Sequence, residues 1–532
     1  MRDRGATDFP LPPDAENCYL QTVASTRPNR ESAGFVPGSA WLAAPGRTEG
    51  AIMDNVEEMG EAPLGRLLVK FSLPAIAVMV VNGLYNFIDR IFIGHGMGTD
   101  ALAAVTAGFP MMIIAMAVGA LFSVGTSTLV SIAMGAGKRD EAKAVLAQGF
   151  AASLASSALV AALGWLFMDP ILAAFGTTAR IMPMAREYLG IIMIGFVFQI
   201  TSMAIANSLR SQNRPQATMV STISGTVLNA ILAPLFIFAF HWGIAGAAWA
   251  TVIAQAFGAA LTLWFIQDHR SVLKIEASKL APKARTIGAM LKLGMPIAVV
   301  NCLSLVMLVV ANNAMSRLGG ETALAVIGIV NAISMLLIFP IVGIAQGAQA
   351  LWGYNYGAGK LDRVRSLTKL TLAWTSLLAI LFTAALELFA RELVAAFNPR
   401  DAALIALGSR GIAIFMLGFF TAGLQYTASM FFMSVGQAAQ GGSLYIAKNL
   451  FTIAGMALLP LAMGLDGVFW TGPLSDLLSA ILSGLLLAAG LKNLKPRPAE
   501  PLPDTAQPGA ETATEGPMVL APALEAEMEP VA

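Results

Sequence analysis

Gly135-Ala136-Gly137-Lys138 recurs as Gly357-Ala358-Gly359-Lys360, and each copy closes a long apolar stretch of the chain. The same offset of 222 residues superimposes Lys70 and Pro74 on Lys292 and Pro296, and Gly125 on Gly347. With an offset one residue shorter, Gly243, Gly246 and Trp249 fall on Gly464, Gly467 and Trp470. Alanine and leucine matches arise readily by chance in so apolar a chain, whereas these ungapped matches do not. We infer an internal duplication.

The composition indicates a membrane protein. Of the 532 residues, 56% are hydrophobic and 12% charged, and the mean hydropathy is +0.70. A soluble domain carries roughly 25% charged residues, so a soluble enzyme is excluded as a class. The high apolar fraction also excludes a disordered or fibrous chain. A helix that crosses a bilayer needs about 20 apolar residues, so this length allows a dozen crossings with loops and tails.

Twelve long apolar segments lie between the tails, and we expect an all-α polytopic fold. They span residues 67–92, 103–134, 143–168, 183–207, 216–240, 244–267, 290–316, 323–351, 367–389, 404–433, 443–463 and 467–491. Each copy of the repeat contains six of them, so both copies enter the membrane from the same side. Two such bundles should be related by a pseudo-two-fold axis along the membrane normal, with a central cleft between them.

Basic residues in the loops predict the orientation. The connections after the second, fourth, sixth and eighth segments hold fourteen lysines and arginines, against six in the alternate connections. The positive-inside rule therefore places both termini and the 269–288 linker in the cytoplasm. The fourteen are Lys138, Arg139, Lys143, Arg210, Arg214, Arg270, Lys274, Lys279, Lys283, Arg285, Lys360, Arg363, Arg365 and Lys369.

The predicted organisation has five parts: a polar, disordered extension 1–64, an amino-terminal lobe 65–268, the cytoplasmic linker 269–288, a carboxy-terminal lobe 289–492 and a disordered tail 493–532. The tail is rich in Pro, Ala and Glu and cannot bury a core. No signal peptide is visible at the start. Translation from Met53 or Met59 rather than Met1 is one hypothesis, because the apolar part begins only near Leu67.

Several stretches resemble the multidrug and toxic-compound extrusion (MATE) family. They are FSLPAI at 71–76, YNFIDRIFIG at 85–94, GTVLN at 225–229, GAAWAT at 246–251 and GYNYGAGK at 353–360. The resemblance covers about residues 65–492 in both halves. It implies a two-lobed exporter in the inner membrane of a bacterium, which we expect to be a monomer and to expel xenobiotics, often cationic and amphipathic. The implied drive is a proton or sodium gradient, with no cofactor beyond the coupling ion.

The same resemblance implies a cation-coupling group in the amino-terminal lobe: Asp89, Asn229, Thr251 and Tyr188. A carboxylate within a membrane span is costly, so Asp89 should face a cavity or a partner. An alternative is that Asp89 and Arg90 reach the outer interface as a pair. Family members often carry an aspartate one turn after the asparagine, where this chain has Ala233. That departure leaves the identity of the coupling ion open. The site could bind Na⁺ at Asp89 and Asn229, it could bind a proton, or it could accept either ion.

Further polar residues within the apolar segments are candidates for the lining of the substrate cleft. They are Gln199, Gln255, Gln346, Gln425 and Asp476. Each has an alternative role as a hydrogen-bonding group between packed helices.

Other chemistries lack their signatures. The chain has no phosphate-binding loop for ATP and no catalytic constellation, so we expect no enzyme activity. Its two cysteines and three histidines have no metal-ligand spacing, and a net charge of +1 gives no reason to expect a nucleic-acid partner. A flippase for lipid-linked saccharides remains the alternative function. It should present basic residues to the cleft, and Arg90 and Lys448 are the few candidates. A channel or a membrane enzyme is a third class, but the sequence shows neither a pore signature nor a catalytic cluster.

Overall fold

The computed structural model describes residues 56–174, 177–396 and 401–495. Some side chains between residues 84 and 102, including that of Asp89, and between 305 and 324 are outside the description. The described residues all belong to one compact unit. Residues 1–55 of the expected extension and 496–532 of the expected tail lie outside the described residues.

The described residues form helices joined by short connections, with no strand among them. The helices are α3 (Leu64–Gly135), α4 (Arg139–Leu166), α5 (Met168–Ala174), α6 (Met182–Ser211), α7 (Pro215–Pro234), α8 (Gly243–Gln267), α9 (Ala284–Gly357), α10 (Leu361–Ala395), α11 (Ala402–Phe415), α12 (Ala422–Ser434), α13 (Ala438–Met463) and α14 (Leu465–Lys492). A π-helix, η1 (Leu235–Ala239), continues α7, and short 3₁₀ helices lie at Ala277–Lys279 and Leu417–Thr421.

Twelve segments of the described chain are long and apolar enough to cross a membrane, which confirms the expected all-α fold. α3 and α9 each supply two, namely Leu64–Gly83 and Ala103–Gly135, and Ala284–Gly320 and Ala325–Gly357. Leu67 and Phe71 pack in one core cluster with Val130 and Met134, so the chain of α3 turns back on itself. In α9 the backbone leaves the helical conformation at Gly320, with φ 62° and ψ −151°.

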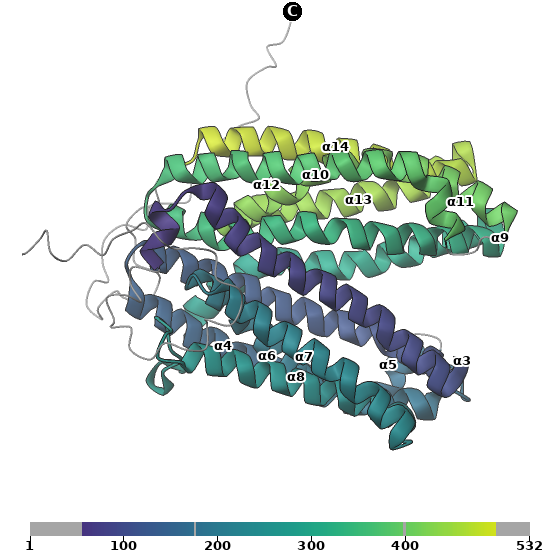
Figure 1. Cartoon of the computed structure of the whole chain (residues 1–532), viewed down its shortest axis with the longest axis horizontal. Helices are drawn as coiled ribbons and strands as arrows, with labels where there is room; N and C mark the ends of the chain where they lie inside the picture. Colours follow the sequence, from purple (N-terminus) through teal and green to yellow (C-terminus); the bar gives the residue numbers. More distant parts are fainter. Residues whose placement is uncertain (1–55, 175–176, 397–400, 496–532) are drawn as a thin grey trace, which may run out of the picture. The chain divides into compact units, whose positions relative to one another are not determined.

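Two groups of helices surround α3 and α9. α3 packs with α4, α6, α7 and α8, and α9 packs with α10, α11, α12 and α13 (Figure 1). The largest apolar cluster joins the halves, because Leu68 and Val130 of α3 share it with Trp352 of α9 and Phe431 of α12. α3 and α9 are therefore the main contact between the two copies of the repeat.

The loops rich in lysine and arginine meet at one end of the helices, which we call the basic end. Arg214, after α6, pairs with Asp268, after α8, at 3.1 Å. Lys279 in the central linker pairs with Asp140 at the start of α4 at 3.2 Å. The linker is packed rather than free, since Leu273 is fully buried in the cluster shared by the halves.

The repeated Gly-Ala-Gly-Lys turns have the same structure. The backbone N–H of Lys138 donates to the carbonyl of Ala133, and that of Lys360 to Asn355, both at 2.9 Å. Gly137 and Gly359 adopt φ values of 73° and 71°, which a glycine accepts without strain. Gly135 lies directly against the backbone of Tyr354, and Gly357 lies against that of Ile132. Because these partners are related by the same offset, the contact is reciprocal, as two-fold-related copies require.

Gly357→Ala is expected to weaken this contact between the halves. A Cβ at Gly357 would overlap the carbonyl oxygen of Ile132, and backbone atoms on both sides leave little room for relief. We expect a clear fall in the Tm of the purified protein. Gly328→Ala is the matched control, because it lies in the same helix and its Cβ would meet no atom within 4 Å. An equal Tm for the two variants would contradict the close approach.

Candidate functional site

Asn229 and Thr251 meet between α7 and α8 in the amino-terminal half. The Nδ2 of Asn229 donates to the Oγ1 of Thr251 at 3.0 Å, and that hydroxyl donates to the Ala247 carbonyl at 3.1 Å. Asn229 is 3% exposed, and its Oδ1 accepts no hydrogen bond from the described residues. The pair therefore offers a buried neutral oxygen of the kind that a small cation or a protonated group binds.

Small residues allow α7 and α8 to approach closely here. Gly225, one turn before Asn229, is so near α8 that an added Cβ would lie 3.0 Å from the carbonyl oxygen of Ala254. One turn after Asn229, Ala233 is fully buried in an apolar cluster with Phe236 and Ala250. Ala233, where the family often has an aspartate, thus packs between helices and offers no oxygen to a cation.

Tyr188 and Asp89, the other two coupling candidates, lie on α6 and α3. Tyr188 is 2% exposed and packs with Leu189 and Met193 in the apolar cluster of the amino-terminal half. It is therefore a core residue of this half rather than an aromatic exposed at an interface. The backbone of Asp89 is part of α3, but its side chain lies outside the described ones, so its coupling role stays a prediction.

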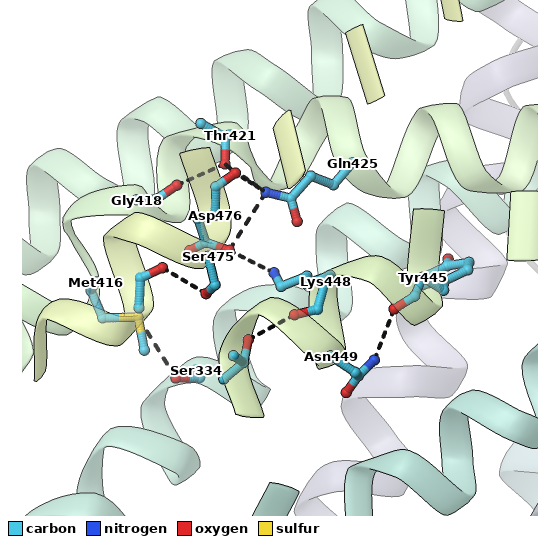
Figure 2. A network of polar contacts seen from close by, with 12 residues as sticks. Ser334, Met416, Gly418, Thr421, Gln425, Tyr445, Lys448, Asn449, Ser475 and Asp476 are labelled. Carbon is cyan, nitrogen blue, oxygen red and sulfur yellow. Dashed lines mark hydrogen bonds and ion pairs between the residues drawn. The ribbon is translucent and has the colours of Figure 1, made fainter. Parts of the chain in front are cut away.

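The carboxy-terminal half contains an ion pair within its helices. Lys448 of α13 approaches Asp476 of α14 with 2.8 Å between Nζ and Oδ1, and the side chains are 30% and 14% exposed. Gln425 of α12 donates to the backbone carbonyl of Asp476 at 3.0 Å and to the Thr421 hydroxyl at 2.7 Å. Figure 2 shows these four side chains together, with Lys448 on α13, Asp476 on α14, Gln425 on α12 and Thr421 at the end of the 3₁₀ helix before α12.

An aromatic ring lies beside the lysine end of this pair. The ammonium of Lys448 lies 6.0 Å from the ring centroid of Tyr426, within the range of a cation–π contact. The ring of Tyr445 packs edge-on against that of Tyr426, with centroids 5.8 Å apart. The ring of Tyr426 and the carboxylate of Asp476 together stabilise a charge that would be costly alone in a membrane span. The pair as a whole is electrically neutral.

The structure brings together two of the five residues predicted to line a cleft, Gln425 and Asp476. Gln255 packs against Gly195 of α6, where an added Cβ would overlap its Oε1, so it acts between helices. Gln346 lies between the two halves at the basic end, where it accepts a hydrogen bond from Arg210 at 3.4 Å. Gln199 is half-buried on α6.

Sequence reasoning named Lys448 only as a basic residue and did not pair it with Asp476. The position of Lys448 on its helix could have indicated that it has a partner. Lys448 falls four residues from both Leu444 and Thr452, which are buried on the packed face of α13. A charged residue on such a face requires a counter-charge, and Asp476 is the acid within the apolar part of the next helix.

A short segment before α3, residues 56–63, connects the two halves at the basic end. Val56 and Met59 are buried, although the sequence placed the beginning of the ordered chain near residue 65. Glu58 pairs with Lys70 at 2.7 Å and accepts from Asn213 at 3.0 Å, both in the amino-terminal half. On the other side, Asn355 and Arg363 donate to the carbonyls of Met59 and Ala62 at 3.1 and 2.7 Å.

The pKa of Glu58 reflects this packing. Burial alone raises the pKa of its carboxyl, but hydrogen bonds from Lys70 and Asn213 and the nearby positive charges outweigh burial, so the net pKa is lowered. A lowered pKa in the folded state means that the carboxylate stabilises the fold above its unfolded pKa. This contribution is lost as the pH falls through the folded pKa.

The family model that matches this chain matches one segment in each copy of the internal repeat. The MatE family model matches residues 74–235 and 296–465, which together are more than half of the chain. The multidrug export protein MepA of Staphylococcus aureus (strain NCTC 8325 / PS 47) is 22% identical over 427 residues, covering 80% of this chain and 94% of MepA. MepA of Staphylococcus haemolyticus (strain JCSC1435) is 22% identical over 435 residues, covering 81% and 95%.

Solved structures share the fold. An outward-facing multidrug resistance MATE family transporter of the MOP superfamily superimposes with a TM-score of 0.78 at 21% identity, covering 84% of this chain and 99% of that one. A MATE in the bent conformation gives 0.77 at 22% identity, covering 82% and 97%. The two matched segments begin at Pro74 and Pro296, which the internal offset relates. The chain belongs to the MATE family of membrane transporters.

Proposed function

We propose that this transporter exports xenobiotics, often cationic and amphipathic, from a bacterial cytoplasm by alternating access, coupled to inward flow of H⁺ or Na⁺. The relatives described above are named multidrug export proteins, which supports the substrate class. The distribution of loop charge supports placing the basic end in the cytoplasm. In this orientation the residues that join the halves at the basic end hold the inner side closed.

The observation that carries the coupling proposal is the Asn229–Thr251 pair. It places a buried amide oxygen without a hydrogen-bond partner among the described residues in an otherwise apolar part of the amino-terminal half. Asp476 of the other half is neutralised by Lys448, so it attracts a cation less strongly. We therefore assign coupling to the amino-terminal half, with Asp89 as the group that changes charge. Substrate and ion then compete for that half.

The alternative flippase gains little support from the described residues. A lipid-linked phosphate needs an uncompensated cation in the cleft, and the charge of Lys448 is compensated by Asp476. The side chain of Arg90, the other basic candidate, lies outside the described ones. The multidrug reading predicts export of small amphipathic cations without any lipid substrate.

Transport into inverted membrane vesicles tests the proposal. A fluorescent lipophilic cation is supplied outside, and either a proton gradient or a sodium gradient is imposed separately. We expect accumulation with one gradient and collapse of accumulation when that gradient is dissipated. Vesicles without the protein are the control. Accumulation with neither gradient, in vesicles that contain folded protein, would overturn coupled drug export and favour the flippase.

A further inference from the structure

Arg210 is a buried cation at the contact between the two halves. It lies in the last turn of α6 and is 9% exposed. Its guanidinium donates to the Oε1 of Gln346 on α9 at 3.4 Å, a long bond to a neutral group. No carboxylate of the described side chains pairs with it within 4.0 Å, whereas the neighbouring Arg214 pairs with Asp268. A buried arginine without an opposite charge is costly, and the carbonyl end of α6 offsets only part of that cost.

A small polar cavity of about 10 Å³ adjoins this guanidinium. Its lining comes from both halves: Ser127, Ser131 and Asn207 with Arg210 on one side, and Gln346 and Gln349 of α9 on the other. Gln349 is 7% exposed, and its Nε2 donates to no acceptor among the described residues. The hydroxyls of Ser131 and Ser211 lie 2.6 Å apart, so one of them donates to the other.

In this lining the Nε2 of Gln349 has no acceptor among the described residues, the guanidinium of Arg210 has only its long bond to Gln346, and no acidic side chain takes part. A guanidinium, an amide N–H₂ and hydroxyls are the groups that bind an anion. The volume corresponds to about one water-sized sphere. A small monatomic anion therefore suits this space better than phosphate, sulfate or an organic carboxylate. A water molecule fits but leaves the charge of Arg210 uncompensated.

We propose that this cavity binds a single small inorganic anion, chloride, between Arg210 and the amide of Gln349. Because the lining comes from both halves, the anion binds only while the basic end is closed. Binding to one conformation stabilises that conformation by mass action, in proportion to the logarithm of anion concentration. Chloride thus acts as a removable counter-charge that holds the two halves together at this end. This inference is independent of the substrate and of the coupling ion.

Thermal unfolding of the purified full-length protein tests the proposal. Chloride is titrated at fixed sodium concentration and ionic strength, with gluconate as the replacement, and bromide and sulfate are compared. We expect a saturable rise in Tm with chloride and bromide, whereas sulfate should give only the gradual, non-saturating rise that it gives folded proteins in general. A Tm that is the same in chloride, bromide and gluconate would overturn the proposal and leave the cavity as a water site.

A variant with an internal counter-charge separates this site from others. Gln346→Glu places a carboxylate beside Arg210 in nearly the same shape, so its Tm is expected to be independent of chloride. Gln440→Glu, an exposed position on α13, is the matched control and should keep the wild-type response. Arg210→Gln should also lose the response. If that variant does not fold, the comparison of Gln346→Glu with Gln440→Glu still shows whether the chloride response of the Tm comes from this cavity. A full chloride response in Gln346→Glu would place the anion elsewhere and overturn the proposal.

Discussion

Asp476→Asn is expected to lower the free energy of unfolding by about 2–3 kcal/mol, which is most of the cost of breaking a buried ion pair. The substitution keeps the shape of the side chain and removes its charge. Lys448 then remains within a membrane span, with its ammonium against Tyr426 and no carboxylate at 2.8 Å. Because the lysine is 30% exposed, the loss should be less than for a fully buried charge.

The matched control lies in the same helix. Asp466 at the start of α14 pairs with Arg410 at 2.6 Å, but these side chains are 35% and 60% exposed. Water screens this pair, so Asp466→Asn should cost less than about 1 kcal/mol. Unfolding of the purified protein, followed by heat or denaturant, measures both variants. Equal losses in the two would show that the membrane-embedded pair has no special role in stability.

A double variant separates the pair from its surroundings. Lys448→Met removes the stranded ammonium while it keeps the apolar length of the side chain. We expect Lys448→Met with Asp476→Asn together to be more stable than Asp476→Asn alone, so the two effects are strongly non-additive. Simple addition of the two losses would mean that Lys448 and Asp476 act independently, in conflict with their contact in the structure.

The sequence predicted the spans well because a membrane crossing is encoded locally. The tenth span was expected at 404–433 and is found at Ala402–Ser434. The ninth was expected at 367–389, whereas α10 runs from Leu361 to Ala395. Its first turns contain Arg363 and Arg365, which the sequence analysis placed in a loop. The structure shows why the helix includes them: their guanidinium groups donate to the carbonyls of Ala62 and Leu491 at the basic end.

The site was less predictable because its pairs join residues that are distant in the chain. Asn229 and Thr251 were expected on neighbouring helices, and motif order was enough to place them there. Glu58 gave no comparable signal, since its partners Lys70 and Asn213 come from separate segments. Arg210 looked like one more positive charge in a loop. Only packing of the two halves shows that it is buried against Gln346.

Asp89→Asn is expected to abolish coupled export while the protein still folds. An amide cannot take up or release a proton, and it carries no charge to attract Na⁺, so the gradient no longer drives the conformational cycle. We expect a loss of export of about tenfold or more. The neutral oxygens of Asn229 and Thr251 remain, so they should not restore coupling alone. Export into inverted vesicles under an imposed gradient measures the loss, and Tm checks the fold.

Exchange without a gradient distinguishes coupling from a general defect. If Asp89 carries the coupling charge, Asp89→Asn should still exchange labelled for unlabelled substrate across vesicles at equilibrium. Asp466→Asn, which removes a partly exposed carboxylate from the other half, should keep both activities. Gradient-driven export at the wild-type rate in Asp89→Asn would assign Asp89 to a structural pair with Arg90. Because the position that follows Asn229 by one turn is the buried Ala233, α7 itself would then offer no acid to bind the ion beside Asn229.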